Sequence, residues 1–415
     1  MDDSAAAYEA RAQRLFSEGA AILDALWDDD VAMVREAGHP EQHTPRATLA
    51  YCHVLLRRGD VARAERAIRA VLALQETHPA DAHRGNFRWL REHPCVNDLN
   101  AVEFVLDDLI ALARDHVSAL SAGIVEEMRR AIALGLREIE RLDVHISYTN
   151  IALSDIANSV LGGELLSDAH FAARGARRLD EWLAFTAASG APHEFNSPTY
   201  LAIDILRIAA LASGTTDATV AAKARTAEAL LWRHAAAHYH PRLAQLAGPH
   251  SRSYFDGWSG AGGFLKLLIW RLLGDERLRQ QTPYVPRDRE EGHIGVTLAS
   301  LECPPDVLTS LRQKMYPFLS QETSNASAGV DLTTYMTEVY ALGSASATYS
   351  VGDPPEPSMG YDSLHAYIAR SDAPGYSALY VRYIIDDNAP SQRAPDHWDQ
   401  GRHIAAQHRN RAIVA

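Results

Sequence analysis

Cysteine and long apolar runs are both scarce in this sequence. It has three cysteines in 415 residues, and no two of them form a Cys-x-x-Cys pair. Neither a disulfide framework nor a zinc ribbon is therefore expected. No apolar run approaches the roughly 20 residues of a membrane-spanning helix, so we expect no membrane protein. The N-terminus also lacks the basic and apolar segments of a signal peptide, which favours the cytoplasm unless a signal has been removed.

Basic residues are outnumbered by acidic ones. The 40 Lys and Arg residues stand against 53 Asp and Glu residues, and the formal net charge is −13. A nucleic-acid-binding protein needs a basic face that neutralises phosphates, so that class of protein is not expected. An acidic small-molecule ligand remains compatible with this charge, because a local cluster of Arg and His can outweigh the average field.

The sequence also lacks the motifs of the common cofactor and metal sites. It contains no P-loop, no Gly-x-Gly-x-x-Gly, no His-Glu-x-x-His, no EF-hand spacing and no Gly-x-Ser-x-Gly elbow. These patterns would bind phosphates, dinucleotides, zinc or calcium, or would expose a nucleophilic serine. We therefore expect neither a metal nor another cofactor.

What the sequence does contain is a regular alternation of two kinds of helix. Segments that are apolar around most of their circumference begin near residues 98, 150, 198 and 257, and each follows a longer amphipathic helix and a polar loop. Apolar helices inside and amphipathic helices outside are typical of an α/α toroid, and a solenoid of helix pairs shares this alternation. We expect closure, because the repeat length varies and no consensus repeat recurs.

The chain changes character after about residue 276, where Pro, Gly and Ser become common. One more helix is expected at 304–319, followed by strands at 361–370, 376–385 and 402–414. The expected fold is mainly α: an incomplete (α/α)5-6 toroid over residues 1–330, then a small antiparallel β region over 331–415. That region is either a small sheet or a truncated one with an open edge.

Two local signals set expected helix ends. Gly162-Gly163 should end the apolar helix that begins at residue 150, because glycine commonly follows the last helical residue. Ser167 should then cap the next helix, over 167–188, through its hydroxyl.

Four polar loops are expected to converge, because alternate loops of a toroid lie at the same end. They span residues 78–98, 142–150, 189–200 and 246–257. Their candidate catalytic residues are His250, Tyr254, Arg252 and Glu194, and their candidate substrate-binding residues are Asn196, Tyr200, Asn150, Tyr148, Asn97, Asp256 and Trp89.

The stretch from His193 to Tyr200 allows two interpretations. Ser197 and Pro198 suit the start of a helix, as capping residue and first-turn residue. Glu194 could act as an acid or base, and Tyr200 could donate a proton. Capping accounts for Ser197 and Pro198 but does not require the other polar residues.

In Gly248–Asp256 every second residue carries a functional side chain: His250, Arg252, Tyr254 and Asp256. In an extended segment they would all point the same way, which predicts that they share one cavity. An Arg that neutralises a carboxylate, beside a His or Tyr that removes the neighbouring proton, suits β-elimination from a uronate. The alternative is a loop pinned by an ion pair between Arg252 and Asp256.

These elements together resemble the α/α-toroid superfamily that includes chondroitin AC lyase-like and heparinase II/III-like polysaccharide lyases. Local stretches, such as 194–200, 248–254 and 340–344, look like motifs of a group of uncharacterised bacterial and fungal toroid proteins. The lyases use Asn, His, Tyr and Arg around the uronate, and Asn150 or Asn196 with His250, Tyr254 and Arg252 are residues of these types. A short β region and no visible signal peptide differ from exported polymer lyases, and for a lyase these departures favour an oligosaccharide over a polymer as substrate.

The leading hypothesis is therefore a lyase that acts on a uronate-containing oligo- or polysaccharide. Three alternatives stay open. The first is a glycoside hydrolase whose carboxylate pair is Glu194 with Asp256 or Asp204, at a separation of roughly 5–10 Å. The second is a dehydratase or cyclase that acts on a small metabolite, and the third is a toroid that binds a glycan or a partner without catalysis.

Overall fold

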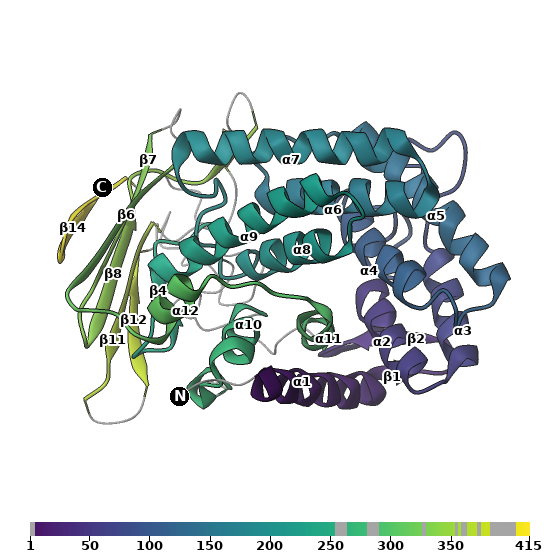
Figure 1. Cartoon of the computed structure of the whole chain (residues 1–415), viewed down its shortest axis with the longest axis horizontal. Coiled ribbons are helices and arrows are strands. Elements are labelled where there is room, and N and C mark those ends of the chain that lie inside the picture. Colours follow the sequence, from purple (N-terminus) through teal and green to yellow (C-terminus); the bar gives the residue numbers. More distant parts are fainter. Residues whose placement is uncertain are drawn as a thin grey trace.

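The computed structural model describes residues 5–253, 264–279, 290–325, 329–352, 356–357, 363–371, 375–381 and 404–415. These residues form a mainly α-helical protein with a small antiparallel β region, as the sequence predicts. In Figure 1 the strands of the largest sheet stand together at one side of the molecule, and the helices fill the remainder. The predicted site residues Tyr254 and Asp256 lie outside the described residues.

A circuit of inner helices forms the centre of the helical part. Its members are α2 (Pro45–Arg57), α4 (Ala101–Asp115), α6 (Thr149–Leu166), α8 (Leu201–Gly214), α10 (Phe264–Leu273) and α11 (Glu290–Leu298). Each contacts the next, and α11 contacts α2, so the contacts return to their start. Helix α6 is buried nearly all round, since fifteen of its 18 residues are buried. Such a helix must be covered on every side.

A second set of helices covers this circuit. It comprises α1 (Ala5–Leu26), α3 (Val61–Leu72), α5 (Ala122–Leu142), α7 (Ala169–Ser189), α9 (Ala218–His238) and α12 (Pro305–Arg312), with the short 3-10 turn η2 (Glu276–Arg279). Each of α3, α5, α7 and α9 packs on the inner helix beside it in sequence. The buried residues of α5 recur at helical spacing, as expected for one covered face. None of the described helices is long and apolar enough to cross a membrane.

The two predicted helix boundaries around residue 165 are wrong. Helix α6 continues through Gly162 and Gly163 to Leu166. A Cβ on Gly163 would lie 2.5 Å from the backbone nitrogen of Ala172, so this glycine lets α6 and α7 approach closely. Ser167 is the left-handed residue that ends α6, with φ 59°, and the side chain of Asp168 caps α7 instead.

The largest sheet has five antiparallel strands in the order β12–β11–β8–β7–β6. Their bounds are β6 (Phe318–Ser324), β7 (Val330–Met336), β8 (Tyr340–Ala345), β11 (Leu364–Ala369) and β12 (Tyr376–Tyr380). Strands β11 and β12 confirm two predicted strands. The helix predicted over 304–319 ends at Arg312 instead, because Pro317 cannot continue a helix and β6 begins one residue later.

One three-stranded sheet and three antiparallel pairs complete the described β structure. They are β1 (Trp27–Asp28), β2 (Met33–Glu36) and β3 (His39–Thr44); β4 (Tyr239–His240) and β5 (Gln245–Leu246); β9 (Ser350–Val351) and β10 (Glu356–Pro357); β13 (Ala405–His408) and β14 (Arg411–Val414). The single strand predicted over 402–414 is thus a hairpin, which turns at Arg409 with φ 51°. The β1–β3 sheet was not predicted.

Two of the predicted loops, 189–200 and 246–253, lie between the helix ends and the face of the five-stranded sheet that is turned toward the helices. Phe195 packs with Leu332 and Tyr349, and Ala247 packs with Met336 and Ala341. Both loops therefore contribute to the small apolar cores of the sheet. The sheet consequently supports the loops that the sequence singles out.

Candidate functional site

Three inner helices meet at their N-terminal ends. The residues before them are Asn100 for α4, Tyr148 for α6 and Tyr200 for α8, and none of the three makes a side-chain cap to its own helix. Tyrosine is a poor capping residue, because its oxygen lies too far from the first peptide N–H groups. The Asn100 amide nitrogen lies 3.5 Å from the Tyr148 hydroxyl, so the helix ends are in contact.

Glu194 supplies the acceptor that α6 lacks. Its Oε2 accepts a hydrogen bond of 3.0 Å from the backbone nitrogen of Asn150, the second residue of α6. Its own backbone nitrogen donates to Oγ1 of Thr149 at 3.1 Å. A carboxylate is favoured at this position, because the N-terminus of a helix carries a partial positive charge. Ser197 closes the turn before α8 instead: its Oγ accepts from the Tyr200 backbone nitrogen at 3.0 Å, and α8 begins at Leu201 and not at Pro198 as predicted.

Arg252 lies at the centre of the cluster. Its guanidinium carbon is 5.1 Å from the centre of the Tyr148 ring and 4.9 Å from that of Tyr200. It donates to the Tyr200 hydroxyl at 3.2 Å, and its Nε is 3.6 Å from Glu194 Oε1. The Glu194 side chain is fully buried, and that of Arg252 is 12% exposed. This ion pair is therefore largely shielded from water.

The prediction that residues 250–256 are extended is wrong at Arg252. This residue has φ 48°, in the left-handed region, which turns the chain and ends the alternation of side chains. His250 instead donates from Nδ1 to the backbone oxygen of Asn196 at 2.9 Å, and its ring is edge-on to His365. The bond to a carbonyl fixes the proton on Nδ1 and leaves the lone pair on Nε2.

Asn196 holds the neighbouring loop in place. Its amide nitrogen donates to the backbone oxygens of Ala247 at 2.6 Å and Pro249 at 2.7 Å. It also has a left-handed φ of 48°, which asparagine tolerates better than most residues. Asn196 therefore connects the 189–200 loop to the 246–253 loop, a structural role that sequence analysis did not assign to it.

Several buried polar atoms in this cluster lack a hydrogen-bond partner among the described residues. They are both side-chain atoms of Asn150, both carboxyl oxygens of Asp204 and Oε1 of Glu194, and each residue is 1% exposed. An unsatisfied buried polar group costs about 1–3 kcal/mol. Such groups are rare in folded proteins, and they indicate a place for a polar ligand or for water.

The cluster shifts the proton affinities of its carboxyl groups. Burial raises the pKa of Glu194 to about 6, although the Arg252 charge opposes the rise. Burial and the Glu194 charge raise the pKa of Asp204 well above its usual value. Burial also raises the pKa of Tyr148 to about 12. The site therefore pairs Glu194, which is mostly ionised at neutral pH beside Arg252, with Asp204, whose raised pKa favours the protonated form. This is the pattern of a base next to an acid.

The raised pKa of Glu194 predicts a pH-dependent contribution to stability. The folded state binds this proton more tightly than the unfolded state, so the contribution is fully present below the ordinary pKa and is lost as the pH rises through about 6. Its full size is about 2 kcal/mol. We expect the difference in unfolding free energy between wild type and Glu194→Gln to change by this amount between pH 4.5 and pH 7.5, measured by urea denaturation. The exposed Glu181→Gln is the control, and a flat difference for Glu194→Gln would contradict the expectation.

Tyr349 joins the cluster from the β region. Its hydroxyl donates to the backbone oxygen of Ser147 at 3.2 Å, and its ring lies 5.6 Å from that of His193. Burial and the nearby Glu194 charge raise its pKa well above the usual value. Tyr349 was not among the predicted site residues, because it follows β8, far along the chain from the four loops, and carries no local signal.

Among the described residues, two predicted site residues make no hydrogen bond or ring contact with the cluster. Asn97 is exposed, and Asn100, three residues later, makes the contact to Tyr148 instead. Trp89 packs edge-on against Phe104 at 5.6 Å, with the Arg46 guanidinium 4.6 Å from its ring centre. The structure thus brings together Glu194, Arg252, Tyr200, Asn150 and Tyr148, and it places His250 and Asn196 in the adjoining loop contact.

Comparison with protein families identifies the group to which the chain is related. Residues 13–300 match the family described as Domain of unknown function (DUF8769). The chain belongs to this family. No curated protein matches the chain. The matched residues include the loops that carry Glu194 and Arg252, whereas the five-stranded sheet lies beyond them.

One group of side chains in this DUF8769 member has the composition of a metal site. Among the described residues, His234, His238 and Glu322 place three potential ligand atoms within 4.8 Å of one another. Nε2 of His234, however, accepts from the backbone nitrogen of Asn196 at 2.8 Å, so the ring proton is on Nδ1. That nitrogen donates to Glu322 at 2.9 Å and has no lone pair for a metal. The group is therefore a hydrogen-bonded network.

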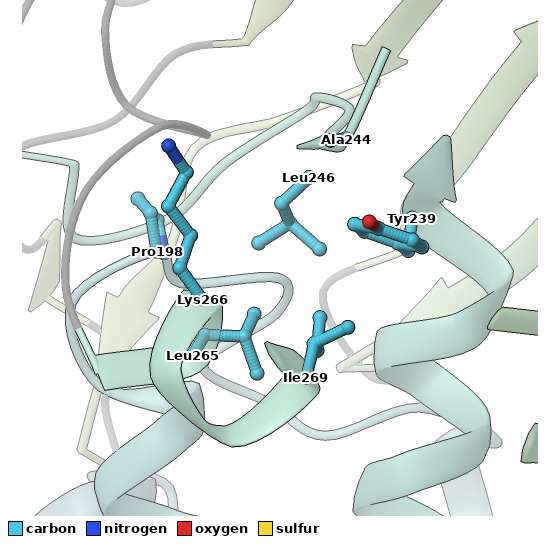
Figure 2. Close-up of a pocket in the computed structure, with 7 residues that line it drawn as sticks. All are labelled: Pro198, Tyr239, Ala244, Leu246, Leu265, Lys266 and Ile269. Carbon is cyan, nitrogen blue, oxygen red and sulfur yellow. The ribbon is translucent and has the colours of Figure 1, made fainter. Parts of the chain in front are cut away.

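A separate apolar pocket lies between α10 and the β4–β5 pair (Figure 2). It is lined by Pro198, Tyr239, Ala244, Leu246, Leu265, Lys266 and Ile269. Among these described lining residues, the polar side-chain groups are the phenol of Tyr239 and the amine of Lys266. The Arg252 cluster is better suited to acid–base chemistry, because it holds two carboxyl groups and a guanidinium.

Proposed function

We propose that this protein is a carbohydrate-active lyase that eliminates next to the carboxylate of a uronate-containing oligosaccharide. The observation that carries the proposal concerns the side chain of Asn150. Its buried side-chain amide has no hydrogen-bond partner among the described residues and lies beside the ion pair of Arg252 and Glu194. An amide and a guanidinium together suit a carboxylate, because both donate to its oxygens. The N-termini of α6 and α8 add a favourable field for an anion.

The chemistry of elimination assigns a role to each group. Arg252 and Asn150 would hold the substrate carboxylate and stabilise the negative charge that develops when the adjacent C–H proton leaves. Glu194, with a pKa of about 6, is suited to accept that proton. The electron pair of the C–H bond becomes the C=C bond, and the C–O bond at the next carbon breaks. Asp204, whose pKa is raised well above its usual value by burial and by the Glu194 charge, is suited to give its proton to the departing oxygen.

The arrangement of elements also supports this proposal. The contacts of the inner helices return from α11 to α2, and an antiparallel sheet follows them in the chain. The toroid lyases have the same order of parts. We therefore infer that the helix circuit is an (α/α) toroid whose polar loops face the sheet.

A turnover assay tests the proposal. We expect the protein to release unsaturated products, detected by ultraviolet absorbance, from at least one oligosaccharide in a panel of defined uronate-containing di- to hexasaccharides. Asn150→Ala should lower the rate by about 100-fold or more. Asn410→Ala is the matched control and should leave the rate unchanged, because Asn410 is exposed in the turn between β13 and β14. The absence of unsaturated product across the panel at pH 5 to 9 would refute the proposal.

Hydrolysis is the second candidate function, and the pairing of Glu194 with Asp204 favours it. Both carboxyl groups are buried, and the Glu194 charge contributes to the raised pKa of Asp204. One protonated and one ionised carboxyl group is the arrangement that glycosidases use. The same incubation distinguishes the two reactions, since hydrolysis releases new reducing ends without ultraviolet absorbance.

A further inference from the structure

The inward face of the five-stranded sheet contacts both loops of the candidate site. Glu322 and Ser324 of β6, Thr334 of β7 and Gly343 of β8 all lie on this face. The strand register requires this, because paired residues of neighbouring strands share a face of the sheet. We propose that Glu322 is a positioning residue, which acts through His234 to fix the backbone of Asn196 and, through Asn196, the loop that carries Arg252.

The first link runs from the sheet to Asn196. Oε2 of Glu322 lies 2.9 Å from Nδ1 of His234, and Nε2 of the same ring accepts from the backbone nitrogen of Asn196 at 2.8 Å. Glu322 thereby fixes the tautomer in which Nε2 is the acceptor, as a carboxylate commonly does for a functional histidine. His234 is buried, so water is a poor substitute for either bond.

The second link runs from Asn196 to Arg252. Asn196 donates to the oxygens of Ala247 and Pro249, and its backbone oxygen accepts from His250. The Phe195 oxygen accepts from the Ser251 backbone nitrogen at 3.1 Å. A displacement of Asn196 would therefore move the residues immediately before Arg252. Both Asn196 and Arg252 have left-handed φ angles, which persist in non-glycine residues only where the surroundings enforce them.

Neighbouring residues of the sheet hold the same two loops. The Ser324 hydroxyl is 3.0 Å from the backbone oxygen of His193, and the Thr334 hydroxyl donates to the oxygen of Gly248 at 2.8 Å. Nε2 of His238 lies 2.7 Å from Oε2 of Glu322, and Nδ1 of the same ring lies 2.8 Å from the Thr334 hydroxyl. The carboxylate of Glu322 therefore anchors two histidines of α9, one for each loop.

Backbone hydrogen exchange at single-residue resolution tests this inference without any saccharide. We expect Glu322→Ala and His234→Ala to accelerate exchange of the Asn196 and Ser251 amides by about tenfold or more, because each removes a hydrogen bond from the chain of contacts. His234→Gln should keep exchange near the wild-type rate, since its amide oxygen can accept from Asn196 without help from Glu322. This protection should survive in the double variant His234→Gln/Glu322→Ala.

A matched variant separates positioning from general loss of stability. Glu338→Ala removes another acidic side chain next to the sheet, one that pairs with Arg242 at the surface, and should leave the Asn196 amide unchanged. The amides of α5, remote from the sheet, report global opening. If Glu322→Ala fails to fold, Glu322→Gln, which keeps an acceptor oxygen, is measured in its place, with a smaller acceleration expected at the same two amides. Unchanged exchange at Asn196, or equal acceleration at Asn196 and in α5, would overturn the inference.

The outcome is independent of the reaction. The inference relies on the proposed function only for the importance of Arg252 and Glu194. If the lyase assay fails while Asn196 exchange responds as expected, the positioning role stands and the substrate assignment falls. If the assay succeeds while exchange at Asn196 is unchanged, the reverse holds.

Discussion

Arg252→Met is expected to lower the unfolding free energy by about 3 kcal/mol at pH 8 and by much less at pH 5. Removing one partner of a buried ion pair leaves the other charge uncompensated, which typically costs 3–5 kcal/mol. Arg252 is the cation that limits the rise of the Glu194 pKa, and that pKa is about 6. At pH 8 Glu194 is ionised and loses its partner. At pH 5 Glu194 is mostly protonated in the wild type, so the loss of Arg252 leaves little uncompensated negative charge in the interior.

Urea denaturation at the two pH values measures this effect, and a double variant isolates its cause. In a Glu194→Gln background, Arg252→Met should cost about the same at pH 5 and pH 8, because the residue that titrates against Arg252 is gone. Arg130→Met is the control, since Arg130 is exposed on α5, pairs with Glu126 at the surface and should show no such pH dependence. An Arg252→Met cost that does not depend on pH would show that Glu194 and Arg252 are not coupled.

Gly343→Ala is expected to be the most damaging single-methyl change in the sheet. A Cβ at Gly343 would lie 1.7 Å from the oxygen of Gly248 and 2.6 Å from the nitrogen of Pro249. Both are backbone atoms, so no side-chain rotation relieves the overlap, and either β8 or the 246–253 loop must move. We expect a loss of about 3 kcal/mol or more in unfolding free energy. A shift of about 1 Å near the site should also lower turnover by roughly 100-fold.

Denaturation and the turnover assay together check this expectation. Gly123→Ala in α5 is the matched control, because a Cβ there meets no described atom within 4 Å. It should be neutral or stabilising by up to about 1 kcal/mol, as expected for alanine in a helix. Equal stability changes in the two variants would mean that the loop accommodates the methyl group without cost.

The helical part of this fold follows from local patterns. Apolar and amphipathic helices differ in how much of their surface must be covered, and that difference is visible in each segment alone. The pattern therefore identifies α4, α6 and α8 as inner helices. Their shared orientation explains why the loops before them meet, as Asn100 and Tyr148 do.

The sequence-based predictions are wrong or missing for residues whose role depends on a distant partner. Gly163 resembles a helix terminator in sequence, but its function is contact with α7 across the helix interface. Arg252 interrupts the expected alternation of side chains because its backbone turns the chain. No glycine directly beside it in the sequence predicts that turn. Tyr349 and Glu322 belong to the sheet, and only the packing of the sheet against the loops reveals their part in the site.

The helices that begin at the site have a thermodynamic consequence. Helices α6 and α8 each start after a tyrosine that makes no side-chain cap, and a carboxylate from another loop serves α6. An anionic ligand that binds among these helix ends would complete them, so its affinity and the melting temperature of the protein are linked quantities. A ligand at about 100 times its dissociation constant adds roughly 2.7 kcal/mol to the stability of the folded state. The thermal transition can therefore rank candidate ligands before any of them is known to react.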